Sequence, residues 1–229
     1  MKALGQDAAR DLLLLSVTAG SADAIGYLAL GEVFTSNMTG NIVLLGIHLG
    51  QGHLVMAGRA LFVLAIFFLG LCLGAWLGKD LPERDWPALA FRLIGLEKIV
   101  LLLFAVGWTV LADKSDVAIV HGFLALLALA MGLQSAALYR LNAPGVGTTA
   151  ITGTLTAFAM GLIHLLFVVK AGTSEIEAGR QRVTFQLSVV FLYCCGAALN
   201  GWLILEIPRV AGCLPFLATV FVARSLQAR

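Results

Sequence analysis

Long apolar runs separated by short charged breaks constrain this chain more than any other feature of its sequence. A membrane-spanning helix needs about 20 apolar residues, so 229 residues allow roughly six to eight crossings and no separate soluble domain. Hydrophobic residues make up 60% of the chain and charged residues 12%, against about 45–50% and 25% in soluble domains. We therefore predict an all-α polytopic membrane protein. Its apolar runs cover residues 12–30, 36–50, 56–78, 91–112, 117–139, 148–169, 184–205 and 211–224.

The composition and the absence of known motifs argue against several functions. The net charge of +2 and the lack of a basic run predict no nucleic-acid partner. The sequence contains no HExxH, GxSxG or P-loop pattern, so we predict no catalytic residues, no metal site, no cofactor and no enzymatic activity. The four cysteines lie in apolar runs without CxxC spacing, which is typical of buried core residues.

Two parts of the chain resemble each other when the sequence is compared with itself. Residues 20–27 align with residues 132–139, and the two segments share a glycine, an alanine and a tyrosine. With the register moved by one further position, TSNMTGN at 35–41 aligns with TTAITGT at 148–154. The pattern predicts a duplication, with residues 1–113 as the first membrane repeat and 114–229 as the second. Together they would form one membrane domain.

The same segments carry a family resemblance. TAGSADAIGY at 18–27, FTSNMTGN at 34–41, MGLQSAA at 131–137 and TAITGTL at 149–155 resemble the DUF1275, or YoaK-like, family of bacterial membrane proteins of unknown function. The resemblance covers nearly the whole chain, and the SNMTGN element is fairly specific. It implies a multi-pass protein of the bacterial inner membrane, but neither a substrate nor a reaction.

The distribution of basic residues favours one of two threadings. With eight full crossings and a cytoplasmic amino terminus, nine of the fifteen Lys and Arg residues would be cytoplasmic. If instead the two Thr-Gly segments, 36–50 and 148–169, enter the membrane and return, twelve would be cytoplasmic, as the positive-inside rule prefers. We therefore predict six full crossings plus two short or discontinuous Thr-Gly helices, in inverted repeats. Eight crossings remain the alternative, because residues 148–169 are long enough to span.

Asp23 is the most informative single residue. A carboxylate in the middle of a span costs roughly 2.5–3.5 kcal/mol on insertion scales, and its neighbouring leucines offset little of that. Asp23 should therefore face protein or water rather than lipid. It is a candidate proton carrier or solute ligand, with a structural carboxylate as the alternative. Its repeat equivalent is Ser135, next to Gln134, so the two halves would differ chemically.

The two Thr-Gly turns supply the other candidate solute ligands. A helix that begins at membrane depth presents unpaired N–H groups and a partial positive charge, which suits an anionic or polar solute. The same residue types also cap helices in any protein, which is the alternative role. The candidate substrate-binding residues are Asp23, Thr35, Ser36, Asn37, Thr39, Gly40, Asn41, Gln134, Ser135, Thr149, Thr152, Gly153 and Thr154.

Further residues suggest a proton relay, an anchor and a packing ridge. His48 and His164 follow the Thr-Gly turns and could relay protons with Asp23, or simply form hydrogen bonds between helices.

Glu97 and Lys98 lie one turn into the run 91–112, where Lys98 can reach the headgroups. Gly70, Gly74 and Gly78 form a double GxxxG ridge for an internal helix or, alternatively, a homodimer.

These features predict a small secondary transporter or facilitator for a small polar or anionic solute that binds near the midplane, with proton coupling through Asp23. Its partners would be membrane lipids and the solute. One alternative is a membrane enzyme acting on a lipid or quinone head group, which requires a cleft open to one leaflet. The other is a structural or assembly protein, which requires a fully bonded Asp23 in a closed interior.

Overall fold

Helices form nearly all of the computed structural model, which describes residues 6–81, 86–111, 116–141, 147–149, 151–168 and 173–228. No strand occurs in these ranges, so the chain is the all-α polytopic membrane protein that the apolar runs predict. The long helices are α1 (Gln6–Ala29), α3 (Leu54–Leu77), α4 (Trp86–Leu111), α5 (Val117–Leu141), α7 (Thr173–Glu206) and α9 (Cys213–Gln227). The shorter elements are α2 (Met38–Gly50), α6 (Ile151–Ile163), the π-helical turn η1 (His164–Val168) and α8 (Pro208–Ala211).

Length and apolar composition allow five segments to cross a membrane: α1, α3, α5, α7 and the α8–α9 pair. The remaining long helix, α4, has 26 residues, which is also enough for a crossing. In an apolar stretch of 18 residues, 67% of the residues of α1 are buried but only 17% of those of α7. Helix α1 therefore lies in the centre of the bundle and α7 at its edge. The largest fully buried side chains come mainly from α1, α4 and α5.

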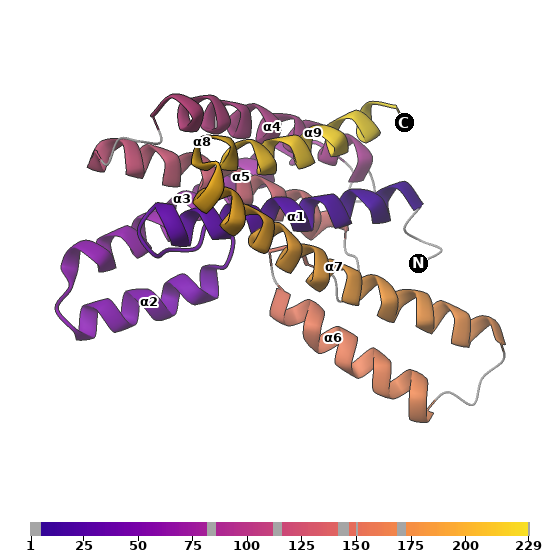
Figure 1. Ribbon diagram of the computed structural model, residues 1–229. Helices are drawn as coiled ribbons and strands as arrows, with labels where there is room; N and C mark the ends of the chain where they lie inside the picture. The colour runs from indigo at the N-terminus through magenta and orange to yellow at the C-terminus, as the bar shows by residue number, and fades with distance from the viewer. Residues whose placement is uncertain are drawn as a thin grey trace.

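The helices of the two halves pack in the same pattern (Figure 1). Helix α1 packs along α7, as α3 does along α5, and α9 packs on α1 as α4 does on α5. Helix α2 pairs with α3, and α6 with α7. Thus α1, α2, α3 and α4 correspond to α5, α6, α7 and α9, and each helix runs opposite to its counterpart. This is the arrangement of inverted repeats, although the predicted boundary at residues 113 and 114 lies outside the described residues.

Glycines set the closest helix contacts. A Cβ atom added at Gly20 of α1 would lie 2.0 Å from the Tyr193 carbonyl oxygen of α7, and one at Gly132 of α5 would lie 2.4 Å from the Phe67 carbonyl oxygen of α3. Gly132 faces Gly70 of α3, and Gly196 of α7 lies against Val17 of α1, where an added Cβ would be 2.5 Å from the Val17 carbonyl oxygen. Small residues allow helix backbones to approach closely in a membrane, so both crossings depend on the absence of a side chain.

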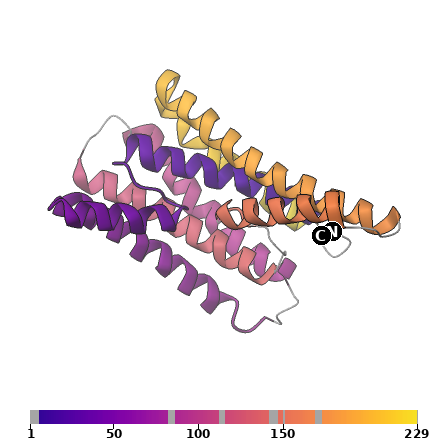
Figure 2. The ribbon, with the colours of Figure 1, turned by 90° about the horizontal axis from the view of Figure 1, so that it is seen from below.

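The chain turns back into the bundle after α1. Gly31 and Glu32 have positive φ angles of 101° and 60°, which reverse its direction. Ser36 then contacts Asp23, six residues before the end of α1, or about 9 Å back along it. Helix α2 has 13 residues, about 20 Å, and runs back toward the side on which α1 ends (Figures 1 and 2). This short length and reversed direction are what the predicted entering and returning segment requires.

The second half repeats this path. Thr149 contacts Ser135, six residues before the end of α5, and α6 runs back toward the end of the molecule where α5 ends. Residues 148–169 are long enough to span, but the regular α-helix there has only 13 residues before it passes into the η1 turn. The geometry therefore agrees with the six-crossing threading and its two discontinuous helices rather than with the eight-crossing alternative.

Three helix starts differ from the sequence prediction. Helix α1 begins at Gln6, six residues before the apolar run 12–30. The last long apolar run starts at residue 184, yet α7 begins at Thr173, and its exposed charged residues extend the helix beyond the apolar core. Charged residues limit the apolar run that the sequence shows, but the helical backbone continues through them. Helix α4 begins at Trp86 rather than at residue 91, with Pro87 in its first turn, where proline is tolerated. Glu97 therefore lies in the middle of α4.

The returning path of α2 predicts which loops share a side of the membrane. We expect cysteines at Glu32 and Gln51, both exposed, to react alike with a membrane-impermeant maleimide, because α2 leaves on the side where α1 ends. A cysteine at Asp80, after α3, should react from the opposite side. The measurement is labelling of intact cells and of inverted vesicles, with the four native cysteines replaced by serine. Opposite sidedness of residues 32 and 51 would restore the eight-crossing threading.

Candidate functional site

The carboxylate of Asp23 is the centre of a buried hydrogen-bond cluster. Its side chain is 4% exposed on α1. One oxygen accepts from the Ser36 backbone N–H at 2.6 Å, and the other accepts from the Ser36 hydroxyl at 2.7 Å and from the Tyr193 hydroxyl. Asp23 therefore joins three elements: α1, the turn before α2, and α7. A carboxylate with three donors has the partners that burial in an apolar interior requires.

The turn before α2 is built by two asparagines. The Asn37 side chain caps α2 by accepting from the Gly40 N–H at 3.2 Å. Asn41, which is fully buried, accepts from the Phe34 N–H at 2.9 Å and donates to the Phe34 carbonyl oxygen. A Cβ at Gly40 would lie 2.9 Å from the Phe34 ring, so glycine lets the turn close. Capping, the alternative role of these residues, is thus observed for Asn37.

The second half contains an equivalent cluster without a carboxylate. Ser135 and Thr149 share a hydrogen bond of 2.8 Å between their hydroxyls, in the positions of Asp23 and Ser36. Thr154, in the position of Asn41, accepts from the Gly147 N–H at 2.9 Å and donates to the Gly147 carbonyl oxygen at 3.1 Å. These contacts pair the same positions as the internal alignment of the sequence does.

Gln134 adds a contact between the halves. The Gln134 amide donates to the Thr148 hydroxyl at 2.8 Å and to the Leu15 carbonyl oxygen of α1 at 3.1 Å. The Gln134 carbonyl oxygen and the Thr35 hydroxyl are buried, and neither has a hydrogen-bond partner within the described ranges. Each half thus places one unsatisfied polar atom beside its Thr-Gly turn.

Tyr193 is a functional candidate that the sequence reasoning missed. The sequence shows Tyr193 as a single phenol in the apolar run 184–205. No motif near it indicates a contact with Asp23, which lies 170 residues away along the chain. The glycine contacts place Phe67 in the equivalent position of the second cluster, because Gly20 faces Tyr193 and Gly132 faces Phe67. The acid and its phenol donor are therefore both absent from the second cluster, where a serine and a phenylalanine replace them.

Several predicted ligands lie away from these clusters. Thr39, Thr152 and Gly153 are exposed, and a Cβ at Gly153 would meet no atom within 4 Å. His48 is half-buried near the far end of α2, about 15 Å along the helix from its start, and its ring lies beside that of His53. His164 is exposed in η1. The structure therefore places neither histidine at the Asp23 carboxylate, whose partners are Ser36 and Tyr193.

The glycine ridge of α3 is occupied within the chain. Gly70 faces Gly132 and Gly74 faces Ala136, both on α5, while Gly78 faces Leu89 and Arg140. The internal use of the ridge, one of the two predicted roles, is observed at Gly70 and Gly74. A homodimer through Gly70, Gly74 and Gly78 stays a prediction, and it would have to displace α5. In the described parts of the chain, no group of three His, Cys, Asp or Glu side chains could hold a metal ion.

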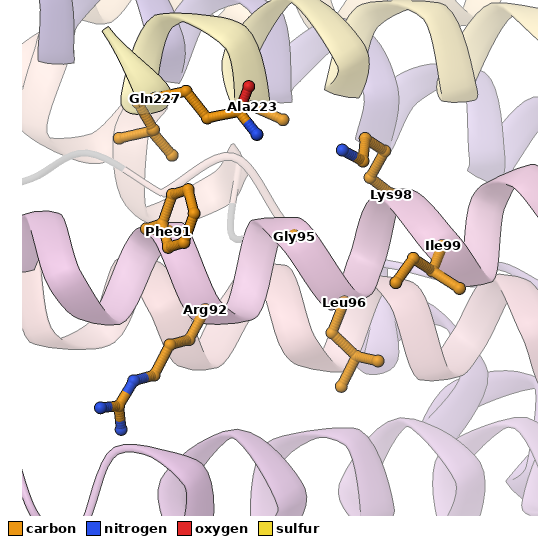
Figure 3. A pocket seen from close by; sticks show the side chains of 9 residues that line it. Phe91, Arg92, Gly95, Leu96, Lys98, Ile99, Ala223 and Gln227 are labelled. Atoms are coloured by element: carbon orange, nitrogen blue, oxygen red, sulfur yellow. The ribbon is translucent and has the colours of Figure 1, made fainter. Parts of the chain in front are cut away.

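A groove between α4 and α9 lies apart from both clusters (Figure 3). It has a volume of about 400 Å³, and its walls combine apolar side chains with two cations, Arg92 and Lys98. Arg92 points away from α9 and donates to the Leu77 carbonyl oxygen at 3.3 Å, whereas Lys98 points toward α9. The lining includes neither Asp23 nor a histidine. Its lining residues are Phe91, Arg92, Gly95, Leu96, Lys98, Ile99, Ala223, Leu226 and Gln227.

Comparisons with known proteins agree with the resemblance found in the sequence. Residues 12–225 match the family described as "Protein of unknown function (DUF1275)". Over 188 residues the chain is 35% identical to the "UPF0700 transmembrane protein YoaK" of Bacillus subtilis (strain 168). The aligned region covers 82% of this chain and 80% of that relative. No solved structure matches the chain. The family match contains both clusters and all the long helices, apart from the first six residues of α1 and the last two of α9, so the chain belongs to the DUF1275 family of membrane proteins.

Proposed function

We propose that this protein is a small secondary transporter or facilitator for a small polar or anionic solute, with proton coupling through Asp23. The observation that carries the proposal is the pair of half-length helices, α2 and α6, which both begin inside the bundle beside a polar cluster. Discontinuous helices in corresponding places of inverted repeats are typical of transporter binding sites near the midplane.

The difference between the clusters supports a division of roles. Asp23 is the group that can take up and release a proton, and the Ser36 and Tyr193 hydroxyls are its donors in this closed arrangement. Ser135 and Thr149 offer hydroxyls without a carboxylate, so an anionic solute meets no like charge there. Proton exchange at Asp23 requires the Tyr193 and Ser36 contacts to open. Because these contacts join α1 to α7 and to the turn before α2, a rocking of these elements would expose the carboxylate.

A structural role is the second candidate, and one observation favours it. Asp23 is 4% exposed and has three donors, which is the fully bonded arrangement that a purely structural carboxylate requires. In this case the Asp23 cluster would only hold α1, α7 and the returning loop together. Both candidates agree on the static contacts and differ only in whether those contacts open.

The proposed setting is the bacterial inner membrane with a cytoplasmic amino terminus. Twelve of the fifteen basic residues lie on the cytoplasmic side in this threading. The lipids of that membrane are then the partners of the α4–α9 groove, whose two cations suit anionic headgroups.

Flux through liposomes tests the proposal. Purified protein would be reconstituted with a trapped pH-sensitive dye, and formate, acetate, lactate, urea and glycerol added outside in turn. We expect at least one of these probes to cause a protein-dependent pH change or uptake. Asp23→Asn should reduce proton-coupled flux to that of protein-free liposomes, because an amide cannot carry the proton.

Glu32→Gln is the matched control, since Glu32 is an exposed acid in the same turn that contacts neither cluster. It should leave flux unchanged. Wild-type flux in a folded Asp23→Asn protein would remove Asp23 from the mechanism. No flux of any probe in wild-type protein would favour the structural role.

A further inference from the structure

A second carboxyl lies inside the bundle, away from the Asp23 cluster. Glu97, in the middle of α4, is 0% exposed. One of its oxygens is 3.5 Å from the Thr219 hydroxyl of α9. The other oxygen is buried and has no hydrogen-bond partner within the described residues. None of the roles proposed above uses this group.

The hydroxyls beside Glu97 have too few hydrogens to stabilise a carboxylate. Thr219 has one hydroxyl hydrogen and three acceptors within reach: the Pro215 carbonyl oxygen at 3.1 Å, the Thr18 hydroxyl at 3.3 Å and Glu97 at 3.5 Å. The nearest acceptor is the Pro215 carbonyl oxygen. Thr18 likewise has the Leu14 carbonyl oxygen at 3.3 Å as acceptor. When Thr219 donates to Pro215, its lone pairs are free to accept a hydrogen bond from Glu97.

The charged and titratable groups around Glu97 do not replace the missing donor. Lys98 lines the groove, Arg92 donates to Leu77, and Asp23 binds Ser36 and Tyr193. Arg140 donates to the Leu81 carbonyl oxygen. The Thr219 hydroxyl, at 3.5 Å, is the one hydrogen-bonding group that reaches the Glu97 carboxyl within the described chain. The titratable groups on the helices packed around α4, and on α1, are Asp7, Arg10, Asp11, Asp23, Tyr27, Arg59, Cys72, His121, Tyr139, Arg140, Arg209, Cys213 and Arg224.

We propose that Glu97 is a proton-binding site that holds its proton in this conformation and donates it in a hydrogen bond to Thr219. A buried carboxylate without a committed donor is strongly unfavourable, whereas the neutral acid fits the donors and acceptors present. Thr219 and Thr18 continue the contact to α1, so the site joins α4, α9 and α1. Loss of the proton would require Thr219 to turn away from Pro215. The site is independent of the transport proposal, since it shares no residue with the Asp23 cluster.

Infrared difference spectroscopy of the protein in lipid membranes tests this. At neutral pH, the spectrum of wild type minus Glu97→Gln should contain the C=O stretching band of a protonated carboxyl, which shifts in D₂O. Glu175→Gln is the matched control, because Glu175 is exposed in the first turn of α7 and should contribute only carboxylate bands. If the Glu97 difference contains only carboxylate bands at neutral pH, the proposal is wrong.

A second pair of variants keeps the test valid if Glu97→Gln fails to fold. Thr219→Val has nearly the same shape but no hydroxyl, so the C=O band should remain and move to higher wavenumber as its hydrogen bond is lost. Thr219→Ser should restore the wild-type position. A band that does not respond to Thr219→Val would show that the proton is not directed at Thr219, and would overturn the assignment.

Discussion

Gly20→Ala is expected to destabilise the protein by about 3 kcal/mol, at the upper end of overpacking effects. The added methyl group would lie 2.0 Å from the Tyr193 carbonyl oxygen and 3.2 Å from the Ala197 backbone nitrogen. Both are backbone atoms inside α7, so no side chain can turn aside and the two helices must separate. That separation also pulls the Tyr193 hydroxyl away from Asp23. Thermal unfolding in detergent should show a Tm lower by roughly 10 °C.

Gly122→Ala on α5 provides the matched control. Gly122 is exposed, and a Cβ there would meet no atom within 4 Å. The same chemical change should therefore leave the Tm equal or raise it slightly, because alanine favours a helix by about 1 kcal/mol over glycine. Equal behaviour of the two variants would contradict the close crossing of α1 and α7.

The second large effect is expected for Asp23→Ala. It would leave the Ser36 N–H, the Ser36 hydroxyl and the Tyr193 hydroxyl without their acceptor in a buried place. An orphaned buried group costs about 1–3 kcal/mol, and the hydroxyls can partly turn to other acceptors, so we expect a total near 3 kcal/mol. The measurement is again the Tm in detergent, together with the fraction of protein that remains monodisperse after heating.

Ser135→Ala is the control at the equivalent position of the second half. It removes one hydroxyl, which also bonds the Met131 carbonyl oxygen of its own helix, and orphans only the Thr149 hydroxyl. We expect a loss of about 1 kcal/mol. If Ser135→Ala lowers the stability as much as Asp23→Ala does, the two clusters stabilise the fold equally, and the carboxylate adds no more stability than a hydroxyl.

Much of the fold could be predicted because it depends on local hydrophobicity and on the repeat. The apolar runs match the helices to within a few residues, except where α1, α4 and α7 extend at their starts through charged or proline-containing turns. The return of α2 followed from its shortness and from the count of basic residues. The internal alignment correctly paired Asp23 with Ser135 and Asn41 with Thr154 as structural equivalents.

The candidate site could be predicted only in part. Asp23 was identifiable because a carboxylate in an apolar span needs partners, and Ser36 because it lies in the adjacent turn. Spacing along the chain selects His48 and His164, but α2 and α6 carry them away from the carboxylate. The sequence places Glu97 near a helix end because the predicted start of α4 is five residues too late. The residue at which a helix begins decides how deep each of its side chains lies in the membrane. That residue is difficult to predict when the first turn of the helix lies outside the apolar run.

By itself, the sequence determined the membrane class, the order of the helices and the existence of two related halves, since these follow from hydrophobicity and periodicity along the chain. The tertiary structure decided which groups meet. Tyr193 reaches Asp23 across 170 residues, and Thr219 reaches Glu97 across 122. Both contacts depend on where helices cross. The crossing of α1 and α7 is set by Gly20 and Gly196, whose partners on the other helix no local pattern reveals.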